Sequence, residues 1–162
     1  MEMTIEDVIK TRRTIHLYEE IEIDDSLLDR FLEAGHFAPN HKLTWPWRFT
    51  VVGHEGRAKI ADRAVELKSE GRTLTDGQVS KIRAKITTPS ALVIVSQLTT
   101  DNAFQSKEDY AAVSCAIQNI SLLAHAEGWG TKWSTGGITR DPCTYEVAGL
   151  DSEEQEIVGF LW

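Results

Sequence analysis

The sequence predicts an α+β fold in which helices flank a central, mostly antiparallel sheet. The apolar run 91–96 is rich in β-branched residues, which is typical of a buried strand. A long helical pattern of apolar residues covers 107–126. Because the predicted helices and strands do not alternate strictly along the chain, α+β is favoured over a doubly wound parallel sheet.

The first predicted element is a helix over 4–13. Thr4 is a suitable N-cap, acidic residues occupy the first turn, and Ile5, Val8 and Ile9 fall on one helical face. Arg12 lies seven residues after Ile5 and continues the same stripe. We therefore expect Arg12 to be partly buried.

A second helix is predicted from an acidic cap at Asp24 or Asp25 to Ala38. It ends there because Pro39 disfavours the helical conformation in the residue before it. A loop over 39–46 leads to a strand at 48–52, and two polar helices are expected between about 55 and 86.

The second half of the chain is organised around the strand at 91–96 and the helix at 107–126. The small and apolar residues of this helix predict a buried central element, with Cys115 packed in the core and Gly128 as its C′ residue. Strands near 130–133 and 156–162 complete the predicted sheet.

Length and composition indicate one domain over 1–162. The chain is 41% hydrophobic and has a net charge of −8, with 25 acidic and 17 basic residues, which disfavours a dedicated nucleic-acid binder. Its two cysteines are too few for a disulfide framework or a metal cluster, so we predict no metal site and a reducing compartment. No secretory signal pattern or membrane-length apolar run occurs, so we expect a cytoplasmic protein without membrane contact.

Arg12, Arg13 and Thr14 form the first candidate site, because two guanidinium groups and a hydroxyl suit a phosphate. The alternative is that both arginines only complement the dipole at the end of the first helix. The expected burial of Arg12 favours the phosphate, since a buried cation without an anionic partner is costly.

Two further segments could contact a ligand. Segment 34–49 carries two prolines, two histidines and two tryptophans, which is typical of a ligand crevice, although a rigid, aromatic-packed loop would look the same. Segment 128–137 is glycine-rich, and Ser134 and Thr135 with nearby backbone N–H groups could meet a polar ring edge. The alternative is a simple turn between a helix and a strand. Its spacing does not fit a dinucleotide fingerprint or a P-loop.

The sequence supports no side-chain nucleophile and no paired carboxylates. Neither cysteine lies in a recognisable reactive context, and no nucleophile-elbow pattern occurs. We therefore predict no catalytic side chain.

Taken together, these segments resemble the nitroreductase family of FMN enzymes, especially its small single-domain branch. The similarity rests on Arg12-Arg13-Thr14, on Ala34-Gly35 with 38–42 (APNHK), and on 46–49 (PWRF). It continues with the glycine-rich segment 128–137 and the closing residues 157–162. The order and separation of these motifs over nearly the whole chain make coincidence an unsatisfactory explanation.

The resemblance implies a homodimer with FMN at the subunit interface. Arg12, Arg13 and Thr14 would hold the phosphate and ribityl end and the pyrimidine edge, while His41 would approach from the partner subunit. The opposite side of the ring system would be lined by Trp133, Ser134 and Thr135. Phe37 is the remaining position expected near the cofactor, where relatives of the small branch often have a basic residue.

Family chemistry implies an oxidoreductase that moves a hydride from NAD(P)H through FMN to a nitroaromatic, quinone or similar small acceptor, in a ping-pong sequence. Leu43 and Trp45 depart from the Asn and Gln of other branches, and the family's wrapping C-terminal tail is either absent or lies outside a sequence that ends at Trp162. An absent tail would lower FMN affinity and dimer stability. The alternative function is a flavin or small-ligand binding module without efficient turnover. A nucleic-acid or membrane-surface adaptor is disfavoured by the net charge.

Overall fold

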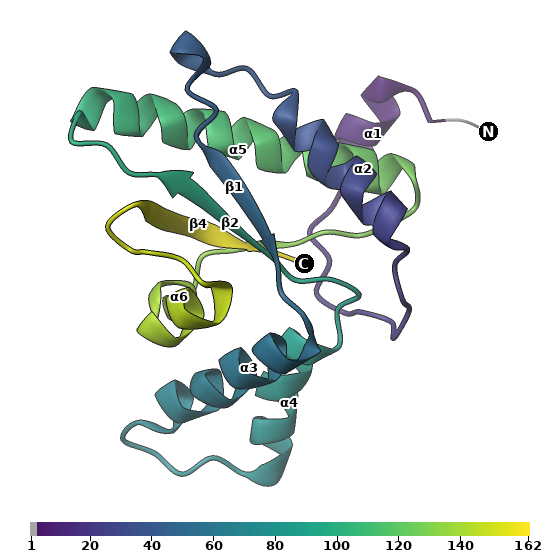
Figure 1. Cartoon of the computed structure of the whole chain (residues 1–162). Helices are drawn as coiled ribbons and strands as arrows, with labels where there is room; N and C mark the ends of the chain where they lie inside the picture. The colour runs from purple at the N-terminus through teal and green to yellow at the C-terminus, as the bar shows by residue number, and fades with distance from the viewer. Residues whose placement is uncertain (1–2) are drawn as a thin grey trace.

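The computed structural model describes residues 3–162 and confirms the predicted α+β class (Figure 1). Four strands form one sheet in the order β1-β2-β4-β3, and every strand pair is antiparallel. The strands are β1 (Trp47–Val51), β2 (Val93–Leu98), β3 (Trp133–Ser134) and β4 (Gln155–Leu161). The sheet is therefore the scaffold on which the three candidate segments are carried.

One face of the sheet is covered by α2 (Asp25–His36) and α5 (Ala103–Ala126), as Figure 1 shows. Phe31, Trp47, Val95, Val113 and Ile117 are all buried between these helices and the strands. The apolar periodicity of both helices predicts this arrangement, and Asp24 caps α2 as expected by accepting from Ser26 N at 2.9 Å.

The opposite face is covered by α3 (His54–Ser69), with α4 (Asp76–Thr87) beside it, and by α6 (Pro142–Ala148). Ile60, Ile94, Ile157 and Phe160 form the core of this layer. The two polar helices were predicted, whereas α6 and the short 3-10 helix η2 (Gly137–Arg140) were not.

The first helix, α1 (Ile5–Thr11), begins at the predicted cap, where Thr4 and Asp7 bond to each other's backbone N–H groups. The expectation of an apolar face turned into the core is only partly right. Val8 is buried, but Ile5 is 69% and Ile9 57% exposed. A single chain therefore leaves most of this apolar stripe uncovered.

The central helix α5 starts four residues earlier than predicted, because the Asn102 side chain accepts from the N–H groups of Phe104 and Gln105. Gly128 follows the helix with φ 84°, as the predicted C′ residue should. The prediction that Cys115 lies in the core is wrong, since Cys115 is exposed. α5 therefore packs on the sheet and on α2, and its remaining side is exposed.

Candidate functional site

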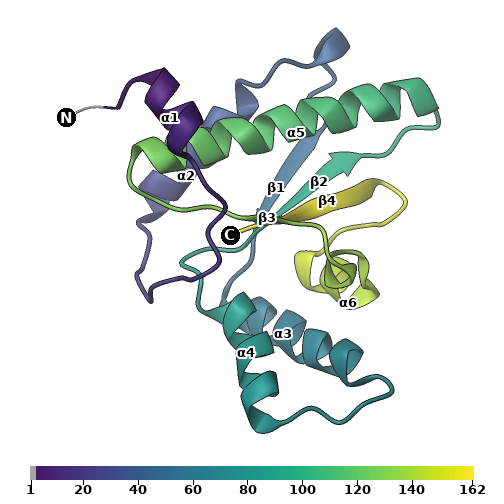
Figure 2. The same ribbon diagram turned by 180° about the vertical axis from the view of Figure 1, so that it is seen from behind.

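The end of α1 and the glycine-rich segment lie side by side, although more than 110 residues separate them. Thr14 forms a parallel bridge with Thr131, and Ile15 N donates to Thr131 O at 3.1 Å. Gly130 permits the approach, since a Cβ there would lie 2.4 Å from Ile15 Cγ1. Figure 2 shows the segment after α1, in purple, crossing the light-green segment that leads from α5 to β3.

The two arginines end α1 in different ways. Arg12 is the C-cap residue and is half-buried, whereas Arg13 is exposed and its Nη1 donates to Lys10 O at 2.7 Å and Arg12 O at 2.8 Å. Arg13 thus performs the helix-end role that was the alternative for both residues. Within residues 3–162, no ion pair joins either guanidinium to a carboxylate. The positive charge at this point is available to an anion.

The edge strand β3 places two predicted site residues next to this cationic corner. Trp133 and Ser134 pair with Leu161 and Phe160 of β4, and Trp162 Nε1 donates to Ser134 Oγ at 3.1 Å. The hydroxyl proton of Ser134 is therefore free to be donated elsewhere. Thr135 follows on the surface.

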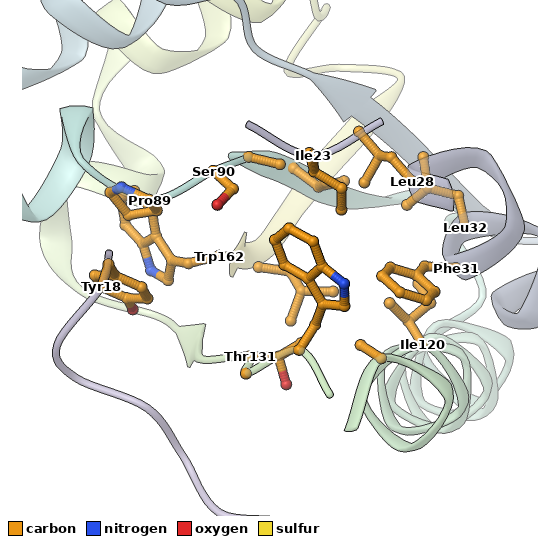
Figure 3. Close-up of a pocket in the computed structure, with 16 residues that line it drawn as sticks. Tyr18, Ile23, Leu28, Phe31, Leu32, Pro89, Ser90, Ile120, Thr131 and Trp162 are labelled. Atoms are coloured by element: carbon orange, nitrogen blue, oxygen red, sulfur yellow. The ribbon is translucent and has the colours of Figure 1, made fainter. Parts of the chain in front are cut away.

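An apolar cavity of about 70 Å³ lies behind this corner (Figure 3). Tyr18, Phe31, Thr131 and Trp162 are among its walls, and burial raises the pKa of Tyr18 to about 12. Ligand pockets for drug-sized molecules measure roughly 300–1,000 Å³. This cavity is therefore too small for a nucleotide cofactor.

His41 lies elsewhere in the single chain. It belongs to the 3-10 helix η1 (His41–Leu43), inside the predicted loop 39–46, and its Nδ1 is 2.8 Å from Glu108 Oε1. At the other end of α5, His125 Nε2 is 2.9 Å from Thr11 Oγ1, next to Arg12. Positions 108 and 125 are 17 residues apart, or about 25 Å along a helix.

Phe37 occupies an intermediate position. It is 78% exposed, and it lines a surface groove with residues of α1 and of the second half of α5, including Ile5, Asn119 and Leu122. One chain thus brings the segment 12–14 next to the segment that leads into β3, which consists of Trp133 and Ser134 and is followed by Thr135. It leaves Phe37 on an open face and His41 at a distance.

Several contacts around these residues were not predicted. The bonds from His41 to Glu108 and from Thr44 to Asp109 leave no local pattern in the sequence, because 67 and 65 residues separate the partners. His36 accepts a hydrogen bond at 2.8 Å from the indole N–H of Trp47. The predicted aromatic packing of this loop is present, with the rings of Trp45 and Trp47 edge to face at 6.0 Å.

Across residues 3–162, no helix combines the length and the apolar character needed to cross a membrane. The same part of the chain contains no group of three or more His, Cys, Asp or Glu side chains placed to hold a metal ion.

Comparison with known proteins identifies the family. The sequence profile of the nitroreductase family matches residues 9–162. The chain belongs to the nitroreductase family. It is 29% identical over 154 residues to "Putative NAD(P)H nitroreductase YfhC" of Bacillus subtilis (strain 168), covering 93% of this chain and 79% of that protein.

Solved structures agree with this family assignment. The nitroreductase-like family protein from Bacillus cereus is 30% identical, with a TM-score of 0.82 over 99% of this chain and 84% of that one. A variant of the FMN and NADPH-dependent nitroreductase NfnB from Sphigopyxis sp. strain HMH has a TM-score of 0.80 at 16% identity, over 98% and 86% of the two chains. The latter similarity concerns the fold alone.

Proposed function

We propose that this nitroreductase-family chain is an FMN-dependent NAD(P)H oxidoreductase that reduces a nitroaromatic, quinone or similar small acceptor. The observation that carries the proposal is the corner where Arg12, Arg13 and Thr14 meet the segment leading to β3. It offers cationic and hydroxyl donors to a phosphate and a tryptophan wall within a few residues. The name of the relative from Bacillus subtilis, which refers to an NAD(P)H nitroreductase, supports the same activity.

The residues present fit FMN at this corner. A phosphate would be held by the guanidinium groups of Arg12 and Arg13 and by the Thr14 hydroxyl, since these donors match phosphate oxygens and no carboxylate neutralises them within residues 3–162. Trp133 would offer its aromatic surface to the ring system. Ser134 and Thr135 would supply hydroxyl donors to its polar edge.

We propose that a second copy of the chain completes the site. His41 contacts Glu108 at one end of α5, and Thr11, which precedes Arg12, contacts His125 at the other end. Because these two ends are about 25 Å apart, only a ligand of about that length could touch Arg12 and His41 of one chain. The open face of α5 carries no Asp, Glu, Lys or Arg between Tyr110 and Ala126, and includes Phe104, which is 70% exposed, and Tyr110, which is 47% exposed. An exposed helix face that lacks charged side chains and carries large aromatic ones is typical of a protein interface.

A twofold axis near the middle of α5 would set the two copies of this helix antiparallel. The end of α5 that carries Glu108 and the loop 40–46 would then lie against the partner's His125 end. His41 would thus reach the partner's phosphate corner, and Phe37 would lie within the covered surface. This arrangement reconciles the scattered positions of the predicted site residues.

Bound FMN would supply the redox chemistry by accepting a hydride from NAD(P)H and passing reducing equivalents to the acceptor. The protein's residues would bind FMN, orient it and stabilise the negative charge that it gains on reduction. The positive charge of Arg12 and the hydroxyl donors of Ser134 and Thr135 favour added negative charge on a neighbouring ligand. No side-chain acid or base is needed for this role, and we propose none.

The test is titration of the purified protein with FMN, comparing wild type with Arg12→Ala. We expect a yellow complex with one FMN per chain, and an FMN Kd raised about tenfold or more by the substitution, because hydrogen bonds to charged groups contribute about 1.5–3 kcal/mol. Arg83→Ala, which breaks an exposed ion pair with Asp62 on the far layer, is the matched control. A wild-type protein that stays colourless, or equal FMN affinity in the two variants, would contradict this assignment.

A binding module without turnover remains the alternative function, motivated by the exposed Phe37 at a position where a basic residue is expected. Anaerobic addition of NAD(P)H separates the two. Loss of the flavin colour, followed by its return on adding a nitroaromatic or quinone, supports the enzyme. Tight FMN binding with no loss of colour supports the module. The two free cysteines, Cys115 and Cys143, also support our proposal of a reducing, cytoplasmic location.

A further inference from the structure

The loop 40–46 has an unusual backbone. Lys42, Leu43 and Trp45 have φ values of 57°, 52° and 48°, and they are the only residues other than glycine with positive φ within 3–162. Left-handed conformations in residues with a Cβ persist only where the surroundings hold them, and they cluster at functional sites. Side-chain hydrogen bonds to α5 hold the loop in this conformation.

Two side-chain hydrogen bonds tie the loop to consecutive residues of α5. Thr44 Oγ1 donates to Asp109 Oδ1 at 2.8 Å, and His41 Nδ1 is 2.8 Å from Glu108 Oε1. A third bond, from Trp45 N to Asn40 Oδ1 at 3.0 Å, is internal to the loop. The rigid helix therefore fixes the loop at two points on either side of the left-handed pair.

Asp109 is the more informative of the two carboxylates. It is 4% exposed, and no cation pairs with it within residues 3–162. A buried carboxylate with no compensating charge is unfavourable compared with an apolar residue of similar size. Neighbouring Ala112 and Val113 show that this side of α5 is otherwise a packing surface. The hydrogen bond from Thr44 is therefore the interaction that Asp109 makes with the loop 40–46.

Glu108 fixes which nitrogen of His41 is available. An ionised carboxylate only accepts hydrogen bonds, so Nδ1 of His41 carries the proton in this pair. Nε2 takes no part in this bond. The bond thus sets both the orientation of the ring and its tautomer.

We propose that Glu108 and Asp109 are positioning residues that hold the strained loop 40–46, so that His41 presents Nε2 to the FMN bound by the partner subunit. This inference rests on the proposed function, because it takes the loop to face the partner's phosphate corner. Neither carboxylate touches the cofactor. Each acts through a loop residue.

The experiment compares, for each tether, a variant that keeps the hydrogen bond with one that removes it. Asp109→Asn and Thr44→Ser keep an acceptor and a donor, whereas Asp109→Leu and Thr44→Val remove them. Glu108→Gln and Glu108→Ala form the corresponding pair at His41. Glu127→Gln is the control, since it alters an exposed pair with Arg30 at the other end of α5.

Two measurements are made on the purified 162-residue chain. Amide hydrogen exchange of 40–46, recorded without FMN, reports the loop itself, and titration with FMN reports the site. We expect the bond-removing variants to exchange about tenfold faster in this segment and to bind FMN about tenfold more weakly. The bond-keeping variants and Glu127→Gln should stay within about twofold of wild type.

The outcomes separate this inference from the proposed function. If wild type binds no FMN, the proposed function fails, while faster loop exchange would still show that the tethers hold the loop. Unchanged loop exchange in both Asp109→Leu and Thr44→Val overturns the inference, even when wild type binds FMN tightly. Equal loss of FMN affinity in Asp109→Asn and Asp109→Leu would also overturn it, because the hydrogen bond would then be irrelevant.

Discussion

Arg12 and Arg13 end the same helix, yet their guanidinium groups lie in different surroundings. Arg13 folds back onto the carbonyl oxygens of Lys10 and Arg12, and so compensates the negative end of α1. Arg12 is half-buried and makes no ion pair within residues 3–162. We therefore expect the proposed phosphate role to fall more heavily on Arg12, because Arg13 could join only by giving up its contacts with the carbonyl oxygens.

Tyr18 provides a residue-scale test of the segment that carries these arginines. Its hydroxyl donates to Ile15 O at 3.2 Å, and burial raises its pKa from 10 to about 12. Between these values the unfolded chain loses the proton while the folded chain keeps it. The contribution of Tyr18 to the free energy of unfolding is therefore fully present below pH 10 and is lost as the pH rises towards about 12.

We expect Tyr18→Phe to remove this pH dependence. The wild-type midpoint of thermal unfolding should fall more than that of the variant between about pH 10 and about pH 12. The difference in tyrosinate absorbance between the two proteins isolates Tyr18 from the other two tyrosines. Parallel loss of stability in both proteins, or ionisation of Tyr18 near its ordinary value, would contradict the burial argument.

At the scale of elements, α5 shows what periodicity can and cannot predict. Its buried residues follow the predicted pattern, so its existence and its place against the sheet were predictable. The position of Cys115 was predicted wrongly because the residues around it are small and uncharged on the buried and on the exposed side of the helix alike. The signals for α6 were present in Asp141, Pro142 and Gly149, which form its N-cap, first turn and left-handed C-cap. They were masked by the short length of the helix.

The candidate site likewise has one part that was predictable from the sequence and one part that was not. The phosphate corner was predictable in composition, because Arg12-Arg13-Thr14 and the glycine-rich segment are each continuous in sequence. Their adjacency depends on Gly130 accepting Ile15, which is a tertiary contact. The two hydrogen bonds that hold the loop 40–46 on α5 join residues more than 60 positions apart and leave no local pattern in the sequence.

Gly159 is the element-scale position where we expect the largest effect on the site. A Cβ at 159 would lie 2.5 Å from Trp133 Nε1 and 2.6 Å from Ser134 O, so β3 would have to move away from β4. Gly159→Ala should destabilise the protein by about 1–3 kcal/mol, as overpacking does. It should also weaken FMN binding and alter tryptophan fluorescence, because Trp133 is displaced.

Gly77→Ala is the control for this substitution, since a Cβ at 77 meets nothing within 4 Å and alanine favours helix over glycine. It should leave FMN affinity unchanged and slightly raise the unfolding midpoint. If Gly159→Ala matched this control in stability and in FMN binding, the close packing of β3 on β4 would not be needed for the site.

For the whole molecule, charge and shape point to the same interface. Each chain carries a net charge of −8, so two copies repel each other unless they meet through an uncharged surface. The open face of α5 is such a surface. The exposed Ile5 and Ile9 of α1 and the exposed Phe37 extend its apolar area near the second half of the helix.

Cys115→Arg tests this interface, because Cys115 is exposed near the middle of α5, close to the expected twofold axis. Two arginines would meet there without an anionic partner, and an uncompensated buried charge costs about 3–5 kcal/mol. The dimerisation constant should fall by a factor of about 100 or more, measured by analytical ultracentrifugation. FMN affinity should fall in parallel, since His41 of the partner subunit would no longer reach the site.

Ser80→Arg places the same charge on the exposed surface of α4 and should leave both the dimer and FMN binding intact. The Cys115→Arg monomer must retain the helical content of wild type, because α5 still packs on the sheet through its opposite face. A folded monomer that binds FMN as tightly as wild type would show that one chain suffices. The role of His41 across the interface would then have to be abandoned, while the phosphate corner at Arg12 would remain.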